Sequence, residues 1–277
     1  MKFIAEGYFD VYIKEFIKKL GSYNRPVFLR FAHEFDNPQY PWSSTGENTP
    51  EDFKAAWRHL TSIIAAEGAD KIVMVWNPWK AESIVDYYPG DEYVDWIGLT
   101  ALHYGPLNDD HLYYSFESLY EPFRQEILNL TNKPVMLAEF GALNMDGTQD
   151  KWIQEAIESI NNKFPEVSGI VLFNSAFDQN IPQTNYNLKF LDWTSNSLSF
   201  IQENFSAKSL STYTTLNEIT STNSLKNPLT RHNIRGVHYK KGKNWKDNYY
   251  ALTRNVLKRD FTLMKEAGIN TIHYTKQ

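Results

Sequence analysis

Short apolar runs alternate with amphipathic stretches along the first 205 residues of the chain. The apolar runs lie at 27–31, 72–76, 93–99, 134–139 and 169–173. Apolar residues recur at helical spacing at 8–20, 50–67, 115–130 and 149–164. Strands that alternate with helices predict parallel strands joined by right-handed crossovers. The pattern therefore predicts an α/β sheet or barrel with five strands in this region.

The stretch that follows Thr49 carries the clearest helix signals. Asp52 stands three residues after Thr49, which is the spacing of a capping box, and Pro50 occupies the first helical position. Apolar residues then follow on one stripe until Gly68, a residue type that ends helices. We expect a helix between Thr49 and Gly68.

The last quarter of the chain has a different composition. About half of residues 206–224 are Ser or Thr, without a sustained hydrophobic period, which is typical of a linker. Beyond it the pattern predicts a strand at 234–239, a helix at 251–267 and a strand at 270–274. The predicted organisation is a partial barrel at 1–205, a linker at 206–230 and a β-α-β unit at 231–277.

Composition and charge exclude several classes of protein. The 42% hydrophobic and 22% charged residues are ordinary for a globular protein, and the apolar runs are far shorter than the ~20 residues of a spanning helix. The net charge is −5 and the chain has no dense basic run, so it lacks a source of electrostatic attraction to the phosphate backbone of a nucleic acid. We expect neither nucleic acid nor membrane as a partner. The chain has no cysteine, which excludes disulfides and thiolate catalysis.

Aromatic residues are unusually frequent. The 8 Trp, 17 Tyr and 17 Phe make up 15% of the chain. Such an excess is typical of sites that stack sugar rings, and equally of a core rich in aromatic side chains. Composition alone leaves both interpretations open.

Two glutamates, Glu34 and Glu139, each follow an apolar run directly. In a barrel of parallel strands, catalytic groups project from the carboxyl ends of the strands, so both would face the same mouth. One protonated and one ionised carboxyl group are what displacement at the anomeric carbon of a sugar requires. The structural alternative is that these glutamates cap helices or pair with arginines.

Motifs surround both glutamates in a fixed order. They are PVFLRFAHE at 26–34, Trp42, AWRH at 56–59, VWNP at 75–78, YYPGDEYVDWIG at 87–98 and LAEFG at 137–141. The ordered set, over about residues 7–205, resembles glycoside hydrolase family 26. The resemblance implies a (β/α)8 TIM barrel and retaining hydrolysis of β-linked polysaccharide, with β-mannan ahead of β-glucan and xylan.

The resemblance also implies roles for particular residues. Glu34, in the Arg-x-x-His-Glu pattern, would be the general acid/base, and Glu139, in the Glu-Phe-Gly pattern, the nucleophile. Arg30 and His33 would support the acid, and Tyr104 would donate a hydrogen bond to the nucleophile. No metal and no cofactor are implied.

Three tryptophans are candidates for contact with sugar. Trp42 matches an aromatic platform near the cleavage point, and Trp42 and Trp79 both lie in loops flanked by proline. Trp76 is also a candidate, although a position within an apolar run gives it a partial core role. We expect two of the three to line the cleft.

The beginning and end of the chain raise further expectations. It starts at the helix that precedes the acid/base strand, so the barrel would be truncated to about five of its eight strands, and the chain alone could be inactive. The last unit weakly resembles the start of a family 2 or family 5 glycoside hydrolase barrel, which predicts a longer polypeptide with further domains. A circular permutation, in which this unit supplies barrel strands, is the less favoured reading.

Two other expectations concern location and activity. No signal peptide is recognisable in residues 1–7, whereas the family resemblance implies an extracellular or periplasmic complete protein. A non-catalytic carbohydrate-binding or scaffold domain that keeps the barrel is the alternative to an enzyme. The altered loop after Glu34 and the missing strands motivate that alternative.

Overall fold

The computed structural model describes most of the chain, in two compact units. The described residues are 1–108, 110, 112–181, 188–205, 234–239, 254–266, 269 and 271–274. Unit 1 holds residues 1–99 and 121–136, and unit 2 holds the other described residues. The linker predicted at 206–230 lies outside the described residues. The predicted division into separate domains stays a prediction.

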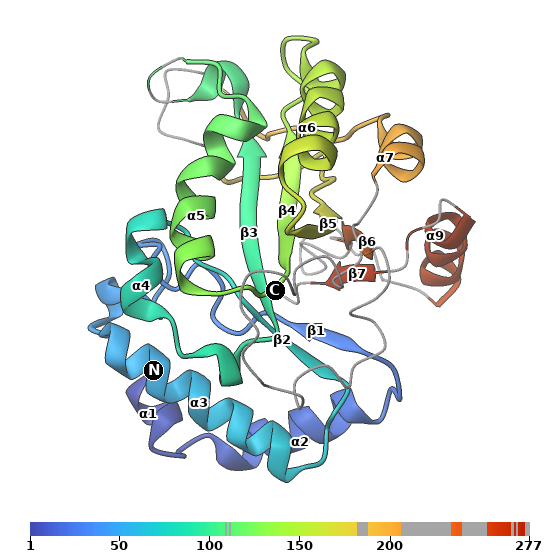
Figure 1. The fold of residues 1–277 in the computed structure, drawn as a ribbon. Helices are drawn as coiled ribbons and strands as arrows, with labels where there is room; N and C mark the ends of the chain where they lie inside the picture. Colours follow the sequence, from blue (N-terminus) through green and yellow to red (C-terminus); the bar gives the residue numbers. More distant parts are fainter. Residues whose placement is uncertain are drawn as a thin grey trace. The chain divides into compact units, whose positions relative to one another are not determined.

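Unit 1 contains the first strands of a parallel sheet. They are β1 (Val27–Leu29), β2 (Ile72–Trp76), the first half of β3 (Trp96–His103) and the start of β4 (Val135–Ala142). β1 pairs with β2, as Figure 1 shows, with Val27 opposite Ile72, and β2 pairs with β3, with Val75 opposite Trp96. The Ile97 N–H donates to the Pro134 carbonyl oxygen at 2.9 Å, which places the start of β4 beside β3.

Unit 2 continues the same order of strands. It holds the ends of β3 and β4, then β5 (Val167–Leu172), β6 (Ile234–Tyr239) and β7 (Thr271–Tyr274). The Phe173 N–H donates to the Phe140 carbonyl oxygen at 2.8 Å, β5 pairs in parallel with β6, and β6 pairs in parallel with β7. Neighbouring strands thus follow the order of the sequence from β1 to β7. The five strands predicted before residue 205 are confirmed, in the sequential order that a (β/α)8 barrel requires.

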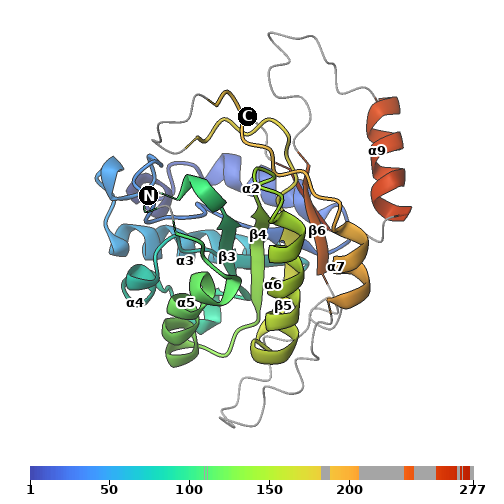
Figure 2. The ribbon, with the colours of Figure 1, turned by 90° about the horizontal axis from the view of Figure 1, so that it is seen from above.

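Helices connect the strands, mostly where the hydrophobic period predicts them. They are α1 (Lys2–Ala5), α2 (Asp10–Gly21), α3 (Pro50–Ala66), α4 (Ile84–Tyr87), α5 (Phe116–Leu130), α6 (Gln149–Lys163), α7 (Leu198–Asn204) and α9 (Arg254–Glu266). The hydrophobic pattern does not predict short helices such as α1 and α7, because so few residues cannot show a helical period. α6 and α7 pack side by side in unit 2 (Figure 2). No helix among the described residues is long and apolar enough to cross a bilayer.

Most of the described tryptophans are packed inside the two units. Trp57, Trp76, Trp96, Trp152 and Trp193 are all almost completely buried. Trp42 and Trp79 keep exposed ring surface, and Trp79 is 36% exposed. The described tryptophans therefore contribute mainly to the core, and among them Trp42 and Trp79 remain partly accessible.

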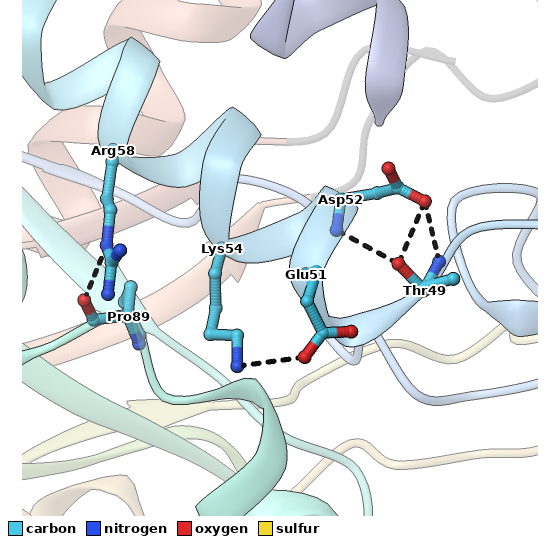
Figure 3. Close-up of polar contacts among 6 residues, drawn as sticks. All are labelled: Thr49, Glu51, Asp52, Lys54, Arg58 and Pro89. Carbon is cyan, nitrogen blue, oxygen red and sulfur yellow. Dashed lines mark hydrogen bonds and ion pairs between the residues drawn. The ribbon is translucent and has the colours of Figure 1, made fainter.

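The start of α3 confirms the predicted capping box. The Asp52 N–H donates to Thr49 Oγ1 at 3.1 Å, and the Thr49 N–H donates to Asp52 Oδ2 at 3.0 Å (Figure 3). Each residue thus satisfies a backbone donor that the first turn of a helix leaves free. The Asp52 carboxylate accepts hydrogen bonds from the Thr49 N–H and the Thr49 hydroxyl, and these hold the pKa of the Asp52 carboxyl below its usual value of 3.8.

Replacing Thr49 with alanine should lower the free energy of unfolding by about 1 kcal/mol, because the Thr49 hydroxyl accepts from the Asp52 N–H and donates to the Asp52 carboxylate. Lys54→Ala is the matched control, since it removes only the ion pair with Glu51, 3.4 Å long, and should change stability by less than about 0.5 kcal/mol. Thermal unfolding of both variants measures the difference. The contribution of the Asp52 carboxylate to the free energy of unfolding is fully present above pH 3.8 and is lost as the pH falls through the lowered pKa of Asp52. Equal effects of the two substitutions would contradict this account.

Candidate catalytic site

The turn after β1 holds Glu34 in an uncommon backbone conformation. β1 ends at Leu29, and the turn then places Ala32 and Glu34 in the left-handed region, with φ of 45° and 50°. This region costs a residue other than glycine about 1 kcal/mol or more, and such strain is concentrated at functional sites. The Glu34 N–H donates to the Asn77 carbonyl oxygen at 2.7 Å, which ties the turn to the loop after β2. Glu34 is only 7% exposed.

Asn77 connects Arg30 with the same turn. Its side-chain oxygen accepts a hydrogen bond from the Arg30 guanidinium, while its carbonyl oxygen accepts one from Glu34. The Asn77 side chain is 1% exposed. Arg30 therefore supports the turn through Asn77. Asn77 is part of the VWNP motif, but the sequence alone indicates no role for it.

Asp36 is a second link between these two loops. Its carboxylate accepts hydrogen bonds from the backbone N–H groups of Trp79, at 2.8 Å, and Lys80, at 2.9 Å. Asp36 is 9% exposed, so its charge is held by these donors largely away from water. Sequence reasoning missed this role, because the partners lie 43 and 44 residues further along the chain.

His33 lies in a small aromatic cluster with Tyr40 and Trp42. The Tyr40 and Trp42 rings stack, with centroids 4.5 Å apart and an interplanar angle of 10°. The Trp42 indole N–H donates to the His33 carbonyl oxygen at 3.0 Å, and His33 Nε2 lies 3.3 Å from the Tyr40 hydroxyl. The structure thus brings His33 and Trp42 together beside Glu34, with Tyr40 as a member that the sequence did not single out.

The other two tryptophans differ in burial. Trp76 is completely buried and packs against Phe35 and Tyr88, with ring centroids 5.0 and 5.2 Å away. Trp79 is partly exposed, and the Lys80 ammonium lies 4.9 Å from its ring centroid. Trp42 and Trp79, rather than Trp76, are therefore the two that offer surface to a ligand. A cleft lined by them stays a prediction.

Glu139 lies inside β4 rather than directly after a strand. The strand extends to Ala142, which corrects the position expected from the sequence, directly after an apolar run. Phe140 is fully buried and contacts Phe116 and Trp152, so this side of β4 faces the helices α5 and α6. Neighbouring strand residues point to opposite faces, so Glu139 points away from these helices, which in a barrel is the inner face.

Gly141 completes the Glu-Phe-Gly motif for a steric reason. A Cβ atom at this position would lie 3.1 Å from the Phe173 carbonyl oxygen. Only glycine therefore lets β4 approach the end of β5 this closely without a shift. In the motif, the core anchor Phe140 and the close approach at Gly141 both directly follow Glu139, which is half-buried.

Tyr104 follows β3 in unit 2 and packs edge-on against Trp193, with ring centroids 5.0 Å apart. The Trp193 indole N–H donates to Asp178 Oδ2 at 3.1 Å, and Asp178 is 2% exposed. The preceding residue, His103, stacks on Trp152 at 5.2 Å, and burial lowers the pKa of its imidazole. The described residues contain no group of three or more His, Asp or Glu side chains that could hold a metal ion.

The predicted site residues divide between the two units. Arg30, His33, Glu34, Trp42, Trp76 and Trp79 belong to unit 1, and Tyr104 and Glu139 belong to unit 2. Within unit 1, hydrogen bonds through Asn77 and ring contacts around His33 link Arg30, Glu34, His33 and Trp42. The catalytic roles of these residues stay predictions.

Comparison with known proteins identifies similar sequences. The family model described as glycosyl hydrolase family 26 matches residues 5–164, which is more than half of the chain. Endoglucanase H of Acetivibrio thermocellus is 31% identical over 180 residues, covering 62% of this chain and 20% of that protein. Beta-1,3-xylanase TXYA of a Vibrio species is 40% identical over 103 residues, covering 35% and 21%.

A third relative is named as an enzyme that acts on mannan. The mannan endo-1,4-beta-mannosidase of Bacillus subtilis is 23% identical over 194 residues, covering 66% of this chain and 49% of that protein. The chain thus spans between about a fifth and about half of the length of these three relatives.

Proposed function

The chain belongs to glycosyl hydrolase family 26, and from this membership we propose that it carries the acid/base and the nucleophile of a retaining β-glycanase. The observation that carries the proposal is that Glu34 and Glu139 both fall inside the matched residues 5–164. Two features of the structure support it. Glu34 is held in a strained, buried turn, and Glu139 points away from the covering helices.

The proposed chemistry has two steps. In the first, Glu34 donates its proton to the glycosidic oxygen while Glu139 attacks the anomeric carbon, so that the glycosidic bond breaks and a glycosyl ester forms on Glu139. In the second, Glu34 accepts a proton from water, which attacks the anomeric carbon and releases Glu139. Two inversions retain the configuration. This pathway requires the two carboxyl groups to lie about 5–5.5 Å apart.

The remaining predicted residues would act around these two. Arg30 would keep Asn77, and through it the Glu34 turn, in place, and Tyr104 would donate a hydrogen bond to Glu139. The stacked Tyr40 and Trp42 rings offer an apolar plate on which a sugar ring could pack.

The proposed substrate class is a β-linked polysaccharide. The names of the relatives cover three backbones, namely an endoglucanase, a beta-1,3-xylanase and a mannan endo-1,4-beta-mannosidase. β-Mannan, the backbone first expected from the motifs, is therefore tested together with β-glucan and β-1,3-xylan. We infer an extracellular or periplasmic setting for the complete protein, because such polymers lie outside the cell.

The test uses the 277-residue chain and the complete product of its gene side by side. Each is assayed for reducing ends on the three polysaccharides, and NMR follows the configuration of the first product. We expect cleavage of at least one backbone by the complete product, with retention. Binding without cleavage by both proteins would replace this proposal with a carbohydrate-binding domain, and an inverted product would refute the mechanism.

A further inference from the structure

Asn37 contacts the proposed acid/base directly. Its side-chain Nδ2 donates a hydrogen bond to Glu34 Oε2 at 2.8 Å, and its backbone N–H donates to the Glu34 carbonyl oxygen at 2.9 Å. Asn37 is 6% exposed and Glu34 7% exposed, so water competes little for either bond. A hydrogen bond to a charged group that is shielded from water is among the stronger ones in proteins.

The orientation of the Asn37 amide is fixed by a second hydrogen bond. The Gln39 backbone N–H donates to Asn37 Oδ1 at 3.0 Å. A backbone N–H can only donate, so the oxygen end of the amide must face Gln39. The NH2 end therefore faces Glu34, and it can only donate to the carboxyl group.

Neighbouring residues hold the backbone around Asn37 in place. The Phe35 ring packs against Phe53 and Trp76, with centroids 4.4 and 5.0 Å away, and Phe35 is fully buried. The Asp36 carboxylate binds two backbone N–H groups of the loop after β2. Asn37 is thus presented to Glu34 by a segment that is anchored on both of its preceding residues.

We propose that Asn37 is a positioning residue that orients the Glu34 carboxyl and favours its ionised form. The proposal rests on the acid/base role given to Glu34 above. A donor next to a carboxyl group stabilises the carboxylate, so this contact sets the pH at which the acid loses its proton. It also reduces the number of rotamers that Glu34 can adopt, which matters because proton transfer requires a narrow geometry.

The informative variant is Asn37→Asp. The new side chain has the same size and keeps an acceptor for the Gln39 N–H, but it replaces the donor to Glu34 with a carboxylate. We expect the basic limb of the kcat pH profile on polysaccharide to move upward by about 1 pH unit or more, because a neighbouring negative charge disfavours ionised Glu34. Asn37→Leu removes the donor without adding charge, and should give a smaller shift in the same direction.

The steady-state constants separate a positioning role from a structural one. We expect kcat on polysaccharide to fall about 10-fold in both variants, with KM nearly unchanged, since Asn37 is only 6% exposed and so offers little surface to a sugar. An aryl glycoside whose leaving group needs no protonation should be affected less in the first step. Asn48→Asp is the matched control, because Asn48 Nδ2 donates to the Pro41 and Ser43 carbonyl oxygens and does not contact Glu34. It should not move the basic limb.

A second measurement does not depend on activity. In the 277-residue chain with 13C-labelled glutamate carboxyl groups, NMR follows the titration of Glu34, assigned by its loss in Glu34→Gln. The midpoint should rise in Asn37→Asp and Asn37→Leu but not in Asn48→Asp. An unchanged midpoint in folded Asn37 variants overturns the inference even if the enzyme is active. A shifted midpoint in a chain whose complete gene product cleaves no polysaccharide upholds the contact and refutes the proposed function instead.

Discussion

Glu139→Gln should abolish hydrolysis of polysaccharide, lowering kcat by about 10⁴-fold or more while leaving substrate affinity largely intact. The contribution of a nucleophile is realised in the transition state, so its loss reduces kcat rather than binding. The substitution keeps the size of a side chain that is half-buried in β4, and it leaves Phe140 and Gly141 in place to hold the strand. Steady-state kinetics and affinity gel electrophoresis of the complete gene product measure the two quantities.

A covalent label identifies the nucleophile independently. A 2-fluoro-glycoside with a good leaving group should trap an ester on Glu139, located by peptide mass spectrometry, because the fluorine slows both steps while the good leaving group keeps the first one fast. Other carboxylates have different tasks: Asp95 accepts the Met74 N–H, and Asp178 accepts the Trp193 indole N–H. A label on either of them, or on Asp36, would refute the assignment.

Glu34→Ala should lower kcat on polysaccharide by about 10²- to 10⁴-fold, the usual contribution of general acid/base catalysis. A substrate with a leaving group that needs no protonation should still react in the first step, and added azide should restore part of the turnover by replacing the water that Glu34 would activate. Azide should then appear in a β-glycosyl azide product, which NMR detects.

The control for this prediction is Glu51→Ala, since Glu51 is exposed and pairs only at the surface with Lys54. It should leave the rates on both substrates unchanged. If Glu34→Ala hydrolyses polysaccharide within a few-fold of the parent, or if azide has no effect on a variant that is folded, Glu34 is not the acid/base.

Elements with a strong local signal could be predicted from the sequence with accurate ends. The helix expected between Thr49 and Gly68 is α3, Pro50–Ala66, because a capping box, a proline at the first position and a terminal glycine are all short-range features. β2 spans the expected residues 72–76, since a strand buried along its whole length is a continuous apolar run. Parallel order followed from the alternation of such elements.

Short-range patterns do not predict element ends or side-chain burial correctly where the hydrophobic period is missing or where a polar residue lies inside an element. The pattern predicts that Glu139 follows its strand, because this charged residue interrupts the apolar run, yet β4 continues to Ala142. Only pairing with neighbouring strands reveals this, since hydrogen bonds from Leu143 to His103 and from Phe173 to Phe140 define where β4 ends. The same argument explains Trp76, whose burial depends on Phe35 and Tyr88 rather than on its own neighbours in β2.

The longer elements, their parallel order and the two candidate glutamates could be predicted from the sequence, because hydrophobic period, caps and motifs are properties of neighbouring residues. The tertiary structure alone decided how Glu34 is held. Its partner Asn77 is 43 residues away, and Asp36 reaches the N–H groups of Trp79 and Lys80 across the same gap. Asn37 is only three residues from Glu34, yet its role as a positioning residue is visible only in the structure. There the left-handed turn brings the Asn37 amide into hydrogen-bond contact with the Glu34 carboxyl group. Contacts of this kind depend on how the turn after β1 packs against the loop after β2, and no pattern of neighbouring residues encodes that packing.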